Sequence, residues 1–149
     1  MTDWSNQRYY EDVQEGDEVP AVEFPLSAHR LIVQASANKD FAQIHHNSEV
    51  AQGQGAPEMY VNNVFHQAMW ERTTREYIGL DGVFKKVGPF RMRIFGVVGE
   101  TVKVHGSVAR KWQEGDQNFV EIELRSEISG GRTAVGPGPV LVTLPSRAT

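Results

Sequence analysis

One short segment of the chain gathers the residue types that acid–base chemistry requires. Residues 39–47 read Lys-Asp-Phe-Ala-Gln-Ile-His-His-Asn, with an acid at Asp40 and a histidine at His45. In a regular helix, side chains five residues apart point about 140° away from each other, so these two converge only where the backbone leaves the helix. A carboxylate beside an imidazole biases the charge and the orientation of the ring. The pair is therefore a candidate acid–base pair, and the alternative is a surface loop in which the two residues are incidental.

The elements expected on either side place this segment at a bend between two helices. Ser27 is a suitable N-cap for a helix over residues 28–36, which has apolar residues on one face. Ser48 can cap a short helix over residues 49–52, and the glycines that follow it favour its termination. Since the chain has to turn between these two helices, a loop conformation that brings the acid and the histidine together is available.

The longest helix is expected over residues 61–78, where apolar residues recur at helical spacing, and Gly79 is a natural stop. Trp70 and Tyr77 lie away from its main apolar face. A helix with large apolar residues on several sides is covered on more than one side. We therefore expect Trp70 and Tyr77 to be candidates for contact with a second subunit.

The remaining segments have the alternation and the turn residues of an antiparallel meander. Gly88-Pro89 interrupts one of the expected strands, and Gly136-Pro137-Gly138 is expected to be a bulge or turn. Together with the long helix these strands predict an α+β fold in which an antiparallel sheet wraps the helix. Residues 1–149 are expected to form a single domain, with residues 1–17 as a polar N-terminal arm. The strands are expected over residues 19–26, 83–98, 101–112, 118–128 and 140–144.

Composition excludes several classes of function. The formal charge of −4 and the pI of about 5.7 give no basic patch for nucleic acid or for anionic lipid. The absence of cysteine excludes disulfides, thiolate catalysis and cysteine-based zinc sites. The side chains of His45 and His46 are adjacent and diverge, so no metal is expected. There is no run of 18 apolar residues and no apolar leader at the N-terminus, so we expect a soluble cytoplasmic protein.

The segment around the acid and the histidine resembles the signature of the MaoC-like dehydratases and (R)-specific enoyl-CoA hydratases. That signature reads Gly-Asp-x-Asn-Pro-hydrophobic-His, with an alanine a few residues later. Asp40, Ile44, His45 and Ala51 stand at the matching positions. The resemblance extends over most of the chain, through residues 10–17, 99–108 and 138–145, and it implies the hot-dog fold.

The chain also departs from that signature. Lys39 replaces the glycine before the acid, Ala42-Gln43 replaces Asn-Pro, and Asn47 replaces a later aspartate. Residues 60–63, Tyr-Val-Asn-Asn, stand where the family has a His-Gly pair that enters the long helix. This pattern is most similar to a divergent branch that includes actinobacterial subunits of steroid side-chain degradation, which can work as pairs of unlike chains.

The resemblance implies the hydration of trans-2-enoyl-CoA to 3-hydroxyacyl-CoA, or the reverse dehydration, without a cofactor. Asp40 and His45 would hold one water, remove its proton as it attacks, and return a proton to the substrate; the sequence leaves open which residue is the base. A backbone N–H at the start of the long helix would bind the developing enolate oxygen, and Asn62 is the candidate.

Two other functions fit the same residues. A hot-dog acyl-CoA thioesterase also uses a carboxylate and water, although the histidine five residues after Asp40 favours hydration. A non-catalytic or half-site subunit of a heteromeric hydratase fits the departures from the signature, although both Asp40 and His45 are retained. The resemblance also implies a homodimer or a heteromer with another MaoC-like chain, because an open sheet edge is usually covered. Acyl carrier protein in place of CoA is left open.

Overall fold

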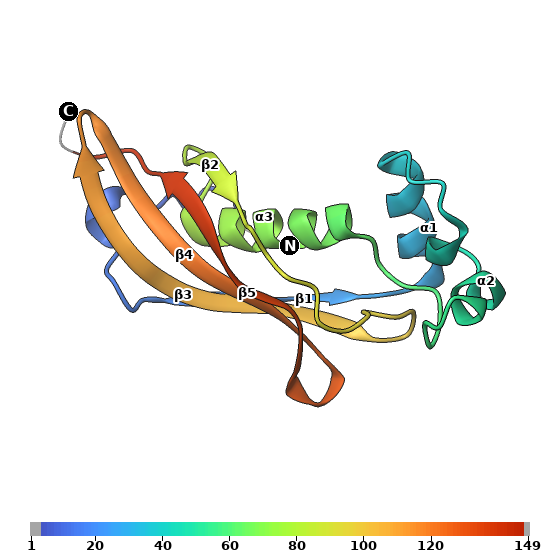
Figure 1. Ribbon diagram of the computed structural model, residues 1–149. Helices are drawn as coiled ribbons and strands as arrows, with labels where there is room; N and C mark the ends of the chain where they lie inside the picture. The colour runs from blue at the N-terminus through green and yellow to red at the C-terminus, as the bar shows by residue number, and fades with distance from the viewer. Residues whose placement is uncertain (1–3, 148–149) are drawn as a thin grey trace.

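A five-stranded antiparallel sheet curves around one long helix in the computed structural model, which describes residues 4–147 (Figure 1). The strand order across the sheet is β1-β3-β4-β5-β2. The expected α+β arrangement is therefore confirmed. The strands are β1 (Glu18–Pro25), β2 (Val83–Val87), β3 (Thr101–Glu114), β4 (Gln117–Ile128) and β5 (Arg132–Thr143), and the helices are α1 (Ala28–Ala37), α2 (Ser48–Gly53) and α3 (Asn63–Ile78), with short 3-10 turns η1 (Tyr10–Asp12), η2 (Gln43–His45) and η3 (Ser129–Gly131).

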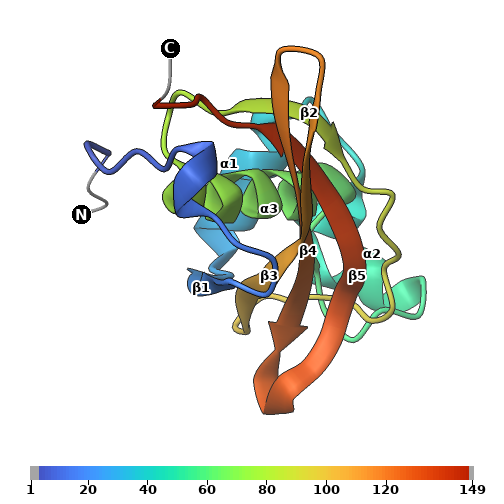
Figure 2. The same cartoon turned by 90° about the vertical axis from the view of Figure 1, so that its left-hand side faces the viewer.

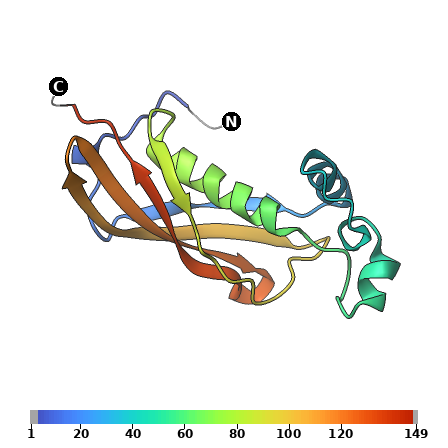
Figure 3. The ribbon, with the colours of Figure 1, turned by 45° about the horizontal axis from the view of Figure 1, so that its top comes forward.

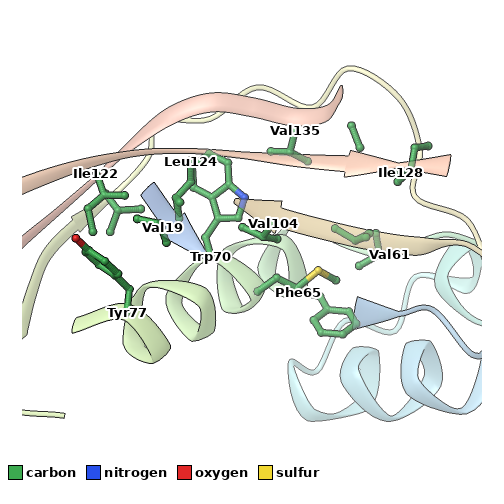
Figure 4. Packing of buried hydrophobic residues seen from close by; sticks show 14 of the residues in the cluster. Val19, Val61, Phe65, Trp70, Tyr77, Val104, Ile122, Leu124, Ile128 and Val135 are labelled. Carbon is green, nitrogen blue, oxygen red and sulfur yellow. The ribbon is translucent and has the colours of Figure 1, made fainter. Parts of the chain in front are cut away.

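Helix α3 lies on the concave face of the sheet, and the core fills the space between them (Figures 1 and 4). Trp70 is fully buried there, and its indole Nε1 donates a hydrogen bond of 2.8 Å to the Ser126 hydroxyl on β4. Tyr77 is 4% exposed and also packs against the sheet side of the core. The expectation that these two aromatic residues face a second subunit is therefore wrong. The curved sheet covers Trp70, and the segment before β1 covers Tyr77 through Arg8, whose guanidinium lies 4.4 Å from the ring centroid, so one subunit buries both rings.

Two expected strands have different limits in the structure. The strand expected over residues 83–98 ends at Val87, and only isolated bridges at Met92 and Val97 follow it. Gly88 has a positive φ of 83°, and Pro89 has no N–H to donate to a ladder, so regular pairing stops there. The last strand, β5, begins at Arg132 rather than at residue 140.

The Gly136-Pro137-Gly138 segment forms a bulge inside β5. Leu124 pairs with Gly138 and Ser126 pairs with Val135, so β5 has one residue more than β4 in this interval. A Cβ on Gly136 or on Gly138 would lie 3.1–3.3 Å from ring atoms of Trp70. A side chain at either position would therefore crowd the indole where it packs against the sheet.

Residues 10–17 of the expected N-terminal arm lie along the outer half of β3, and residues 1–3 of that arm lie outside the described residues. Val13 is fully buried, and Lys111 on β3 donates through Nζ to the carbonyl oxygens of Tyr10 and Val13 at 2.8 and 2.6 Å. Strand β1 pairs only with the first half of β3, through Ser107. The arm thus covers the part of the β3 edge that β1 leaves open.

Helices α1 and α2 lie beyond the N-terminal end of α3, away from the main body of the sheet (Figure 3), so they lie behind α3 in the end-on view of Figure 2. Ser27 caps α1 by accepting a hydrogen bond from the N–H of Arg30, as expected. Asn47, and not Ser48, caps α2 by accepting one from Val50. The candidate acid–base segment joins these two helices, so the fold brings it to the start of α3.

One histidine of α3 lies outside the candidate acid–base segment and is buried in the core. His66 is fully buried, and neither of its ring nitrogens has a hydrogen-bond partner in the described part of the chain. Burial lowers its pKa from 6.5 to about 4, because the charged ring cannot be solvated there.

The lowered pKa of His66 predicts a loss of stability in mild acid. The unfolded chain binds a proton near pH 6.5, whereas the folded protein does not bind it until about pH 4. The free energy of unfolding should therefore decrease as the pH is lowered through this window, and it should be about 2 kcal/mol smaller at pH 5 than at pH 7. His66→Leu removes this proton uptake, so its stability relative to wild type should rise as the pH falls.

Urea titrations of both proteins at pH 7, 6 and 5 measure this difference, and contributions from other groups cancel in it. His29, exposed on α1, provides the matched control, and His29→Gln should follow wild type at every pH. A difference between His66→Leu and wild type that stays constant with pH would contradict the prediction.

Candidate active site

The backbone turns sharply between the end of α1 and Asp40. Lys39 has a positive φ of 56°, in the left-handed region that glycine adopts most easily, and the N–H of Asp40 donates to the carbonyl of Ala35 at 2.9 Å. This is the position at which the resembling signature has glycine. The N–H of Ala42 then donates to Asp40 Oδ1 at 3.3 Å, and the 3-10 turn η2 carries the chain to His45. The chain therefore leaves helical geometry at Lys39, before Asp40, and the extended backbone at Ala42 and the turn η2 then carry it to His45.

This turn brings the side chains of Asp40 and His45 together. The Nε2 atom of His45 lies 3.3 Å from Oδ2 of Asp40. The imidazole is largely buried, at 9% exposed, whereas the carboxylate is 32% exposed. The separation is longer than the 2.7–2.9 Å of a tight charge-assisted hydrogen bond. Both groups can therefore contact a third group, such as a water, that enters from the carboxylate side.

The orientation of the His45 ring is set from behind. Its Nδ1 lies 2.7 Å from the backbone carbonyl oxygen of Tyr60, and this oxygen can only accept a hydrogen bond. Nδ1 therefore carries a proton, and in the neutral ring Nε2 has the free lone pair on the side of Asp40. The ring of Tyr60 also packs edge-on against the imidazole, with centroids 5.2 Å apart. The exposed His46 is not part of this arrangement.

Asn62 lies at the junction of this pair and α3. It is the N-cap of the helix, and its Oδ1 accepts a hydrogen bond of 2.8 Å from the N–H of Phe65. Its Nδ2 donates a hydrogen bond of 3.0 Å to Oδ2 of Asp40. The N-terminus of α3, with the partial positive charge of its backbone N–H groups, therefore lies beside the carboxylate.

A hollow of about 440 Å³ opens in front of these groups. Its polar wall consists of the Asp40–His45 pair and the start of α3 through Val64. Its apolar wall includes Tyr60, Met92 and Phe95, and the rings of Tyr60 and Phe95 contact each other with centroids 4.4 Å apart. Within residues 4–147, no group of three or more His, Asp or Glu residues is placed to hold a metal ion.

Part of this site was not predicted from the sequence. The Tyr60 contact is made by a backbone carbonyl, and because every residue has one, the residue type at position 60 does not predict this contact. Met92 and Phe95 come from a segment that was expected to be strand and is irregular instead. The amide contact of Asn62 with Asp40 was also missed, because only the backbone of Asn62 was considered.

The comparisons with known proteins found structural likeness without close sequence similarity. No protein-family model and no curated protein matches the sequence. Among solved structures, the (R)-hydratase PhaJ1 from Pseudomonas aeruginosa superposes with a TM-score of 0.82 at 16% identity, over 93% of this chain and 86% of that one. The (R)-hydratase of polyhydroxyalkanoate (PHA) biosynthesis from A. caviae gives 0.80 at 17% identity, over 91% and 99%. A chain of the ChsH1–ChsH2 complex from Mycobacterium tuberculosis gives 0.79 at 19% identity, over 88% and 98%.

The chain has the hot-dog fold. Agreement over nearly the whole length of both chains confirms the expected fold class, with the curved antiparallel sheet wrapped around α3. MaoC-like dehydratases are also among these structural neighbours. None of the helices in the described range is long and apolar enough to cross a membrane. The roles of Asp40, His45 and Asn62 in catalysis stay predictions.

Proposed function

We propose that this hot-dog protein is a MaoC-like hydratase that adds water to trans-2-enoyl-CoA thioesters and catalyses the reverse dehydration of 3-hydroxyacyl-CoA. The observation that carries the proposal is the approach of His45 Nε2 to Asp40 Oδ2, with Nδ1 committed to the Tyr60 carbonyl. This arrangement presents one lone pair and one carboxylate to the same hollow. It suits a water that must lose a proton as its oxygen attacks carbon.

The proposed reaction needs only the side chains and backbone of the site. The oxygen of a water held by Asp40 and His45 attacks C3 of the enoyl thioester, and the pair takes up one of the water's protons. The electrons of the double bond move onto C2 and the thioester oxygen. The pair then delivers one proton to C2, so that H and OH have been added across the double bond and the protein is restored. No cofactor takes part.

The start of α3 supplies donors for the thioester oxygen in this proposal. The first N–H groups of a helix have no partner within the helix, and they attract developing negative charge. Asn62, Asn63 and Val64 all line the hollow. The backbone N–H of Asn62 remains the candidate from sequence, and those of Asn63 and Val64 in the first helical turn can serve the same oxygen.

The apolar wall fits the acyl part of the substrate. Met92, Phe95 and the ring of Tyr60 would contact a fatty acyl chain or a bulkier apolar group, while the CoA arm would extend from the mouth of the hollow. A hollow of this size encloses the reacting end of such a thioester and not its whole length. The proposal places the protein in the cytoplasm with its CoA thioester substrate.

We further propose that the active unit is at least a dimer, either of identical chains or with another MaoC-like chain. The edge strands β1 and β2 leave ladder groups available for pairing, and one of the similar solved structures is a complex of two named subunits. Sedimentation of the purified protein at micromolar concentration measures the state of the chain alone. A monomer with full hydratase activity would contradict this part of the proposal.

The decisive experiment follows the conjugated enoyl thioester by its absorbance. Purified protein is incubated with crotonyl-CoA, with a longer enoyl-CoA and with a bulky enoyl-CoA, and the absorbance should fall as the double bond is hydrated. Release of free thiol without loss of the double bond would indicate a thioesterase instead. Inactivity on all three substrates, with activity only after a second MaoC-like chain is added, would indicate a half-site subunit.

A further inference from the structure

The side chain of Asn62 makes two hydrogen bonds that connect the acid–base pair to α3. Its Oδ1 accepts from the N–H of Phe65 at 2.8 Å, and its Nδ2 donates to Asp40 Oδ2 at 3.0 Å. The first bond fixes the orientation of the amide, because a backbone N–H can be satisfied only by the oxygen. The nitrogen must then point toward Asp40. Asn62 is 6% exposed, so the two protein partners hold its amide with little competition from solvent.

The oxygen of Asp40 that receives this bond is the one nearest to the histidine. Oδ2 lies 3.0 Å from Asn62 Nδ2 and 3.3 Å from His45 Nε2, whereas Oδ1 accepts from the N–H of Ala42. With both oxygens held, rotation of the carboxylate about its last bond is opposed. The amide is a neutral donor that does not titrate, so it can hold the carboxylate without exchanging a proton with it.

We propose that Asn62 is a positioning residue for the hydration reaction. Its amide holds the Asp40 carboxylate in register with His45 Nε2 and with the backbone donors at the start of α3. This inference rests on the proposed function and assigns to the Asn62 side chain a role distinct from that of its backbone N–H. Because misplacement of a catalytic group by about 1 Å can reduce a rate by about 100-fold, loss of this contact should be visible in kcat.

Replacement by serine separates the two bonds of the Asn62 side chain. A serine hydroxyl caps a helix about as well as asparagine does, but it is too short to hold the Asp40 carboxylate as well. Asn62→Ser also keeps the backbone N–H that was proposed for the thioester oxygen. We expect kcat to fall about 10- to 100-fold, with KM and the midpoint of urea unfolding close to wild type. Asn62→Ala should lose the cap as well, and its unfolding midpoint should fall.

The chain offers a matched control for this substitution. Asn47 caps α2 through its own Oδ1, which accepts from the N–H of Val50 at 3.2 Å. Asn47→Ser is therefore the same exchange at another helix N-cap in the neighbouring segment. It should keep wild-type kcat, KM and unfolding midpoint.

Replacement by aspartate gives a second readout that a merely structural role would not move. Asn62→Asp keeps the cap but places a second carboxylate beside Asp40, which favours protonated forms of the pair. The acidic limb of the kcat–pH profile should then move to higher pH by about one unit. The NMR titration of the His45 ring should move in the same direction, and it can be measured whether or not the protein turns over substrate.

These measurements distinguish the two proposals from each other. Wild-type kcat in Asn62→Ser, together with an unshifted His45 titration in Asn62→Asp, would overturn the positioning role. An inactive wild-type protein whose His45 titration still shifts in Asn62→Asp would contradict the proposed function and leave the contact itself supported.

Discussion

Substitution of His45 by alanine is expected to lower kcat/KM for enoyl-CoA hydration by about two to four orders of magnitude. In the proposed reaction the imidazole and the Asp40 carboxylate hold the water together and the pair takes up one of its protons, so loss of the ring removes half of this pair. Asp40→Asn should cause a loss of similar size, because the amide keeps the shape of the carboxylate but removes its negative charge. The measurement is the initial rate of absorbance loss with the best enoyl-CoA substrate.

His46 provides the control for this pair of substitutions. It is adjacent to His45 in sequence but exposed, so His46→Ala should stay within a few-fold of the wild-type rate. Circular dichroism and the urea midpoint show whether each variant is folded. A folded His45→Ala or Asp40→Asn protein with a rate within a few-fold of wild type would remove that residue from the mechanism.

The largest expected loss of stability is at Trp70. The indole is fully buried, packs against Phe90 with ring centroids 5.2 Å apart, and donates to the buried Ser126 hydroxyl. Trp70→Ala would leave a cavity between α3 and the sheet and an unpaired hydroxyl. The expected cost is about 3–5 kcal/mol in the free energy of unfolding, measured by urea titration with intrinsic fluorescence or circular dichroism.

Smaller substitutions at the same contact separate the contribution of the hydrogen bond from that of the buried ring. Trp70→Phe keeps an aromatic ring in the core but removes the Nε1–H, and Ser126→Ala removes the acceptor. Each should cost about 1–3 kcal/mol, and the double variant should cost less than the sum, because each single change leaves a buried polar partner unpaired. Strict additivity would show that the hydrogen bond does not couple the two residues. A Trp70→Ala protein as stable as wild type would show that the indole lies outside the core.

The pattern of residue types along the chain predicted the order of the helices and strands, although not the limits of two strands, and it also indicated the acid–base pair. Ser27 and the apolar spacing after it predicted α1, and the spacing after residue 61 predicted most of α3. The acid and the histidine at positions 40 and 45 were recognised because their chemistry depends on residue type, and the loop between the flanking helices allowed them to converge. Helix caps, apolar spacing and the chemistry of a side chain depend on residues close together in the sequence, so the sequence pattern can predict them.

The tertiary structure alone decided how the site is held. His45 is oriented by the Tyr60 carbonyl, which is 15 residues away, and Asp40 by the Asn62 amide, which is 22 residues away. A backbone carbonyl has no residue type to read, and an asparagine at a helix start predicts a cap without showing what its nitrogen meets. Trp70 was misplaced for a related reason, since helical spacing shows which residues share a face but not how far a curved sheet extends around it. Contacts between distant segments depend on how the elements pack, and packing is a property of the whole chain.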